Sequence, residues 1–308
     1  VSFGRSVNPA QTIADEINKV KEYRLANNIE TMIIPGNQYA KLSIGLDFNT
    51  DELDGVSREG LEILMRLLNR GSGQTSKETF DEIKLQKDIS LFFAAGNDGL
   101  SVVASAYDDN LQDTLSLIKE VLSNPNFSQA EFEAEKQKVF YELMAEEKTS
   151  ISKIEEEFFK GTRSYASKEQ RLKELEALTL DDIKNIYALM MSTSKVNASL
   201  TGPVEEKPYL QDIFNAELST NMGTYRPYTK DKPPSYYTYM PNTEPKIFVQ
   251  ADDVKQANIT VAYKFKRPEN ASDIAKIRTL NMILGGSMDS RLFVDMRENR
   301  KLAYSVES

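Results

Sequence analysis

The sequence predicts an α+β fold made of two layered domains, each a mostly antiparallel sheet with helices packed on one side. Its length of 308 residues corresponds to about two domains. Segments with alternating apolar residues, such as residues 39–48, lie among segments with helical spacing, such as residues 110–124. Strand pairs are followed by helices instead of alternating strictly with them, which indicates the α+β class.

The composition indicates a globular chain and argues against some classes of binding partner. Hydrophobic residues make up 40% of the chain, which is enough for an ordinary core. The formal net charge of −9 argues against nucleic acid or an anionic membrane as the main partner. No apolar run approaches the ~18 residues that cross a bilayer, so we expect a soluble chain. The chain begins at Val1 without a basic-then-apolar leader, so we expect a processed or excised piece.

Two residue types are missing, and their absence limits the chemistry. The chain has no cysteine, which excludes disulfides and thiolate catalysis. It also has no histidine, so it cannot supply a tetrahedral nitrogen and sulfur zinc site or a serine, histidine and aspartate triad. Acid–base chemistry by carboxylates or lysine stays open.

The first predicted domain covers residues 1–220. Its helices are recognised by apolar residues three or four apart and by residues that cap or break helices at their ends, such as Ser128 and Pro125. The predicted helices are residues 9–27, 57–70, 76–87, 110–124, a long acidic helix after Ser128, 167–177 and 179–192. The predicted strands are residues 31–34, 39–48, 89–95, 100–107 and 195–200.

Residues 221–235, rich in proline, glycine and charge, are the predicted linker to a second domain at residues 236–308. Strands are expected at residues 236–240, 246–250 and 258–265, and Ser272 opens a helix. The closing stretch, residues 290–308, joins a helix to a strand with alternating apolar residues, which places Arg297 and Tyr304 seven residues apart across a tight turn. This domain stops after one further strand, so it is predicted to be truncated.

The pattern LGG, SRLF, RE and LAYSV over residues 284–306 closely resembles the second domain of a half-molecule in the pitrilysin, insulysin and mitochondrial processing peptidase family of zinc peptidases. Catalytic members carry His-x-x-Glu-His nine residues before a glycine, here Gly71, and a third ligand 76 residues after the second His. The resemblance places Glu62, Met65 and Arg66 at the motif and Glu142 at the third ligand, with Glu135 as the supporting acid.

An arginine and a methionine thus stand where chelating groups are needed, so no zinc is expected in this chain. The alternative for Glu142 is a solvated or salt-bridged helix residue.

The resemblance also implies a substrate-binding role for Arg297 and Tyr304. In the family, the half that lacks the metal motif commonly supplies such a pair to the peptide at the zinc of the other half, where both side chains can donate to a developing oxyanion. The alternative is an arginine exposed at a helix end and a tyrosine packed in the core. Lys301 departs from the family, which usually has glycine there, and this bears on the turn geometry.

The sequence therefore predicts a catalytically inactive half, or partner subunit, of a zinc metallopeptidase. It would enclose and bind peptide, with no catalytic residue, metal ligand or cofactor of its own and with zinc only in a partner half that carries His-x-x-Glu-His. Nucleic acid and membrane are not expected partners. A structural or assembly subunit of the same fold and a stand-alone peptide-binding module are the alternatives. The compartment stays open, with the bacterial periplasm as the expectation.

Overall fold

The computed structural model describes residues 19–36, 40–49, 56–96, 99–147, 149–160, 165–227, 247, 257–263, 268 and 270–308. The chain divides into two compact units, Val1–Tyr236 and Tyr237–Ser308, and each is treated by itself. The predicted domain limits stay a prediction, because residues 228–235 of the expected linker lie outside the described part.

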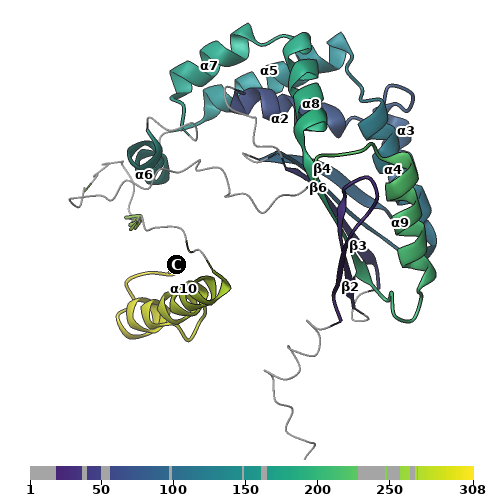
Figure 1. The fold of residues 1–308 in the computed structure, drawn as a ribbon. Helices are drawn as coiled ribbons and strands as arrows, with labels where there is room; N and C mark the ends of the chain where they lie inside the picture. Colours follow the sequence, from purple (N-terminus) through teal and green to yellow (C-terminus); the bar gives the residue numbers. More distant parts are fainter. Residues whose placement is uncertain are drawn as a thin grey trace, which may run out of the picture. The chain divides into compact units, whose positions relative to one another are not determined.

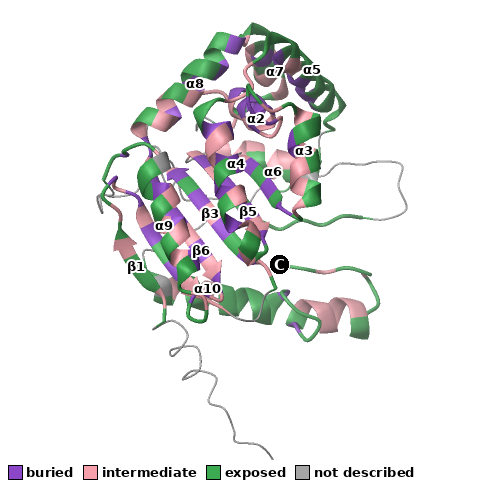
Figure 2. Ribbon diagram, turned by 90° about the vertical axis from the view of Figure 1, so that its right-hand side faces the viewer, coloured by how far each residue is buried: buried purple, intermediate pink, exposed green. Residues whose placement is uncertain are grey.

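The first unit is built on a six-stranded sheet with the order β1-β2-β6-β3-β5-β4. Neighbouring strands are antiparallel except β2 and β6, which are parallel. Buried and more exposed residues alternate along β3, β5 and β6, as a sheet covered on one face requires (Figure 2). This confirms the α+β class. The strands are β1 (Lys21–Arg24), β2 (Glu30–Pro35), β3 (Leu42–Asn49), β4 (Ser90–Gly96), β5 (Gly99–Ala106) and β6 (Lys195–Gly202).

Helices cover one face of this sheet, with α4 and α9 side by side (Figure 1). Helices α2, α4 and α8 contact the strands, while α5 and α7 pack against α2. The helices are α2 (Arg58–Leu68), α3 (Lys77–Gln86), α4 (Leu111–Ser123), α5 (Gln129–Ala145), α6 (Ser150–Phe159), α7 (Lys168–Ala177), α8 (Leu180–Thr193) and α9 (Tyr209–Asn221). None of the described helices is long and apolar enough to span a membrane.

Capping residues define the first residue of most helices in this unit. Ser57, Ser128 and Thr179 cap α2, α5 and α8 by accepting a hydrogen bond from the backbone N–H three residues later. Gly71, whose φ is +91°, follows the end of α2. These caps agree with the predicted helices at residues 57–70, after Ser128 and at 179–192.

Three local predictions for this unit are corrected. A helix was predicted at residues 9–27, but Lys21–Arg24 form strand β1, and residues 1–18 lie outside the described part. The strands predicted at residues 31–34 and 39–48 follow one another along the chain, as if around a turn, but they do not pair, because β6 lies between β2 and β3. Helices α6 and α9 were not predicted. Strand pairing depends on partners far away in the sequence, which local periodicity does not reveal.

The second unit holds α10 (Ala271–Leu284) and the π-helical segment η2 (Phe293–Asn299). Asn270, and not Ser272, caps α10. Residues 302–306 and 258–263, predicted as strands, form no strand here. A strand needs a hydrogen-bonded neighbour, and no described residue pairs with either segment. The strands predicted at 236–240 and 246–250 lie outside the described residues, apart from Ile247.

Candidate functional site

The positions that correspond to the metal motif meet between α2 and α5. Arg66 on α2 donates from Nη1 and Nη2 to the two carboxylate oxygens of Glu142 on α5, at 3.2 and 2.5 Å. Its Nη2 also donates to Oε1 of Glu62, one turn earlier on α2, at 2.7 Å. Residues 76 positions apart in the sequence are therefore in direct contact, through a guanidinium group that bridges two carboxylates. Met65, the third motif position, lies on the same helix.

These residues do not fit a zinc ion. Burial lowers the pKa of Arg66, but hydrogen bonds to Glu142 and Glu62 outweigh it, so its pKa lies above the ordinary guanidinium value. The group stays charged and repels a metal cation from the oxygens that would bind it. Within the described residues, no three histidine, cysteine, aspartate or glutamate side chains form a group able to hold a metal.

Glu135 extends the same ion cluster, because its Oε2 lies 3.8 Å from Nη1 of Arg66. It accepts hydrogen bonds from Nε of Arg70 and from Nζ of Lys138, each at 2.9 Å. Burial raises the pKa of Glu135, but the hydrogen bonds from Lys138 and Arg70 outweigh it and hold the pKa below its usual value. Glu135 is only 3% exposed, although it lies on the acidic helix that was predicted after Ser128. Arg70 lies 65 residues earlier, just after the end of α2, and the sequence of α5 alone gives no sign of this partner.

Glu59 carries a role that the sequence analysis missed. It is fully buried on α2, and Nε of Arg171 on α7 donates to its Oε1 at 2.5 Å. Arg171 also donates from Nη1 to Oε2 of Glu146, at the end of α5, at 2.7 Å. The Oε2 atom of Glu59 has no hydrogen-bond partner among the described residues. Nothing in the local sequence distinguishes Glu59 from the exposed glutamates, because its partner lies 112 residues away.

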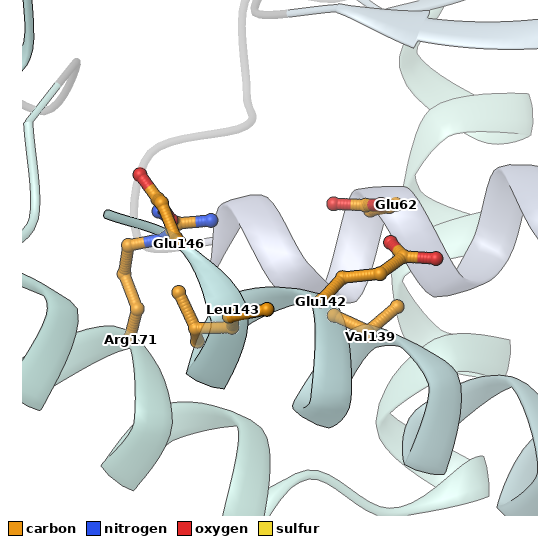
Figure 3. A pocket seen from close by; sticks show the side chains of 7 residues that line it. Glu62, Val139, Glu142, Leu143, Glu146 and Arg171 are labelled. Carbon is orange, nitrogen blue, oxygen red and sulfur yellow. The ribbon is translucent and has the colours of Figure 1, made fainter. Parts of the chain in front are cut away.

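A cavity of about 400 Å³ opens between α2, α5 and the start of α7. Figure 3 shows Glu146 beside Arg171 at one end, Glu62 and Glu142 at the other, and Val139 and Leu143 along the same wall. Ala145 completes the lining. The cavity therefore combines three carboxylates and Arg171 with an apolar wall, and it includes Glu62 and Glu142, which the sequence resemblance aligns with the metal motif.

In the second unit, Arg297 and Tyr304 lie together. The guanidinium carbon of Arg297 is 4.8 Å from the ring centroid of Tyr304 and 4.8 Å from that of Phe293. Tyr304 is 85% exposed, so the alternative of a tyrosine packed in the core is wrong for this structure. The substrate role of the pair stays a prediction.

Two backbone features shape this region. Lys301 has a φ of +53°, the left-handed conformation that favours glycine. The turn therefore keeps the backbone of a glycine position although the residue is lysine. Gly285, which follows α10, leaves room for Ser308: a Cβ at this glycine would lie 2.7 Å from the Ser308 nitrogen.

Comparisons with known proteins agree with this geometry. Residues 177–308 match the model of the Peptidase M16 inactive domain. The chain is 24% identical over 249 residues to the Helicobacter pylori "Non-peptidase homolog YmxG". The alignment covers 80% of this chain and 56% of that protein. It is 22% identical over 302 residues to the Bacillus subtilis "Uncharacterized zinc protease YmxG", covering 94% of this chain and 69% of that protein. The chain thus spans little more than half of the Helicobacter relative.

Solved structures share the fold. A peptidase M16 inactive domain from Pseudomonas fluorescens superposes with a TM-score of 0.71 at 15% identity, covering 94% of this chain and 70% of that one. The periplasmic protease PqqL from Escherichia coli gives 0.57 at 14% identity, covering 70% of this chain and 25% of that one. Together with the family model and the curated relatives, they show that the chain is similar to M16 peptidases and to proteins described as their inactive homologues, and that it shares their fold.

Proposed function

We propose that this chain is the non-catalytic half of a two-half M16 peptidase. It closes over a half that carries His-x-x-Glu-His, helps to hold an extended peptide, and supplies Arg297 and Tyr304 to the zinc site of that other half. The zinc resides in the other half, and this chain alone hydrolyses nothing. The observation that carries the proposal is the stacked Arg297–Tyr304 pair.

The pair suits the stabilisation of a developing negative charge. Stacking on Tyr304 and Phe293 restrains the guanidinium through cation–π contacts but does not use its N–H groups. The exposed Tyr304 side chain carries a hydroxyl donor close to the same guanidinium. Donors fixed in advance lower a hydrolytic barrier because they need little reorganisation as charge forms on the scissile carbonyl.

Two further features support peptide holding without hydrolysis. Strand β4 is an edge of the sheet, where an extended peptide can pair, although the side chain of Asn69 already bonds the backbone N–H and C=O of Phe93. At the positions that align with the metal motif, Glu62, Met65 and Arg66, an arginine replaces a metal ligand of the family. Among similar structures, the ferredoxin protease FusC, of whose length this chain covers 24%, was solved in complex with Arabidopsis ferredoxin. That complex concerns FusC, and we extend only the idea of a protein substrate to this chain.

The test combines the full protein that contains this chain with its zinc-bearing partner half and follows cleavage of a fluorescence-quenched peptide. Removal of one donor to an oxyanion lowers kcat by ~10²-fold or more. We therefore expect a loss of this size for Arg297→Met and a loss for Tyr304→Phe. Arg291→Met, an exposed arginine of the same segment, is the control. Full activity of both test variants in an intact complex would leave only a structural role.

A further inference from the structure

We propose that Asn69 closes the edge of strand β4 to an extended peptide, and that a peptide pairs with this edge only after it has displaced the Asn69 side chain. The inference deepens the proposed function and rests on its peptide-holding part. Asn69 directly follows α2, and its carboxamide bonds the backbone of Phe93 in the middle of β4.

The carboxamide of Asn69 takes the place of a neighbouring strand. Its Nδ2 donates to the carbonyl oxygen of Phe93 at 2.8 Å, and its Oδ1 accepts a hydrogen bond from the Phe93 N–H at 3.0 Å. A carboxamide offers the donor and the acceptor that a peptide group offers, and facing residues of an antiparallel pair exchange the same two bonds. The N–H of Phe93 can only donate, which fixes Oδ1 on its side. Asn69 therefore makes the bonds that an added peptide would need at Phe93.

Phe93 lies at the centre of this edge. β4 ends the sheet and pairs with β5, where Phe93 is opposite Val102. Backbone groups of an antiparallel strand point alternately to its two sides, so the Phe93 groups that reach Asn69 face away from β5. By the same alternation, the backbone groups of Leu91 and Ala95 face this outer side. A peptide along β4 would need all three residues, and Asn69 occupies the middle one.

The surroundings of Asn69 allow an exchange between a bound and a released side chain. Its Nδ2 also donates to the carbonyl oxygen of Met65, one turn earlier on α2, at 2.9 Å, which holds the carboxamide in place. Phe93 is 1% exposed and α2 contacts β4, so the core fixes the strand beside the helix end. Asn69 itself is only half-buried, so water can replace its hydrogen bonds when the side chain turns away.

A closed edge has a consequence for the choice of peptide. An open edge strand offers unpaired groups to any other extended chain and promotes aggregation. With Asn69 in place, a peptide must replace two existing hydrogen bonds before it gains its own at Phe93. Asn69 therefore restricts β4 to peptides that bring further contacts, because backbone pairing alone is partly offset by the bonds that it breaks.

The experiment uses a fluorescein-labelled peptide of alternating threonine and valine with a lysine at each end, a composition that favours an extended backbone. A second peptide of the same sequence is N-methylated at its central residues and cannot donate to a strand edge. Fluorescence polarisation measures the Kd of each for the full protein that contains this chain. We expect Asn69→Ala to bind the unmethylated peptide ~10-fold more tightly than the unchanged protein does, which corresponds to about 1.4 kcal/mol. The methylated peptide should show no such gain.

Two further variants locate the effect. Asn69→Leu keeps the size of the side chain without its hydrogen bonds, so it should show the same gain and still reports if Asn69→Ala fails to fold. Asn27→Ala is the matched control, because Nδ2 of Asn27 donates to the carbonyl oxygens of Leu218 and Gly223. Asn27 lies between β1 and β2, at the opposite edge of the sheet, so its loss should leave the peptide affinity unchanged.

Amide hydrogen exchange of Phe93, followed by NMR, reports the contact itself. Without peptide, this amide should exchange ~10-fold faster in Asn69→Leu than in the unchanged protein, because its acceptor is removed. Added peptide should slow the exchange in the variant again. Exchange that stays fast in the presence of peptide would show that the peptide does not take the place of Asn69.

Equal peptide affinities of the unchanged protein and the Asn69 variants would overturn this inference, and so would an absence of binding in all of them or an equal gain in Asn27→Ala. The proposed function is judged separately by the cleavage assay. Loss of cleavage in the Arg297 and Tyr304 variants together with equal peptide affinities would reject the role of Asn69 alone. Tighter binding by the Asn69 variants together with full cleavage by the Arg297 and Tyr304 variants would reject the role of that pair and keep Asn69.

Discussion

Two arginines in this molecule stand in opposite environments. Arg66 lies between two carboxylates and gives them its Nη1 and Nη2 hydrogen bonds, whereas Arg297 lies against two aromatic rings. The first guanidinium neutralises charge inside the fold. The second is held in place by groups that accept none of its strong hydrogen bonds. The difference teaches that the neighbours of an arginine, and not the residue itself, decide between a structural ion pair and a donor available to a substrate.

The largest expected effect comes from breaking the first environment. The triple variant E62H/M65E/R66H restores the family's motif on α2 and frees Glu142, which already faces position 66, as a third ligand. We expect the variant to bind zinc with a Kd of ~1 µM or tighter, about 8 kcal/mol of binding free energy. Isothermal titration calorimetry measures it, with the unchanged chain as the control. Zinc binding at equal strength by the unchanged chain would contradict the account of Arg66.

A second prediction compares how much the buried carboxylate of Glu135 and the exposed carboxylate of Glu142 each stabilise the fold. Glu135→Gln should lower the free energy of unfolding by ~3 kcal/mol, because it removes the charge of a buried carboxylate that binds Arg70 and Lys138. Glu142 is 59% exposed on its side chain, so Glu142→Gln should cost only ~1 kcal/mol or less. Urea unfolding measures both. Similar losses of unfolding free energy in the two variants would show that burial does not decide how much each carboxylate stabilises the fold.

The pH dependence of the unfolding free energy tests the contribution of Glu135 in a second way. The pKa of Glu135 is lower in the folded chain than in the unfolded chain, so its ion cluster stabilises the fold above the ordinary glutamate pKa. That contribution decreases as the pH falls below the pKa of Glu135 in the unfolded chain, and it is lost once the pH has fallen through the lower pKa of the folded chain. The difference in unfolding free energy between the unchanged chain and Glu135→Gln should therefore shrink in this acid range. A difference that stays constant down to pH 2 would be inconsistent with the lowered pKa.

The smallest effect concerns the turn that carries Tyr304. Lys301→Gly removes the cost of a left-handed backbone at a residue with a side chain, ~1 kcal/mol. Amide hydrogen exchange over residues 297–304 should slow by ~5-fold. Lys276→Gly, inside α10, is the opposite control and should speed exchange there, because glycine destabilises a helix interior. Faster exchange in the Lys301 variant would mean that the left-handed turn does not hold this segment.

The part of the site that could be predicted depended on local patterns and on one spacing. Apolar periodicity and capping residues predicted α2 and α5, and the 76-residue spacing brought Arg66 to Glu142. The burial of Glu135 and the Glu59–Arg171 pair were not predictable in this way, because Arg70 and Arg171 come from distant parts of the sequence. Residues 302–306 alternate as a strand does, but alternation produces a strand only beside a pairing partner.

The most direct test of the central claim measures the peptidase activity of the zinc-bearing half alone, with this chain, and with its Arg297→Met variant. The account predicts cleavage only when both halves are present, and ~10²-fold less cleavage with the variant in a complex of the same size. Full activity of the zinc-bearing half by itself would contradict it.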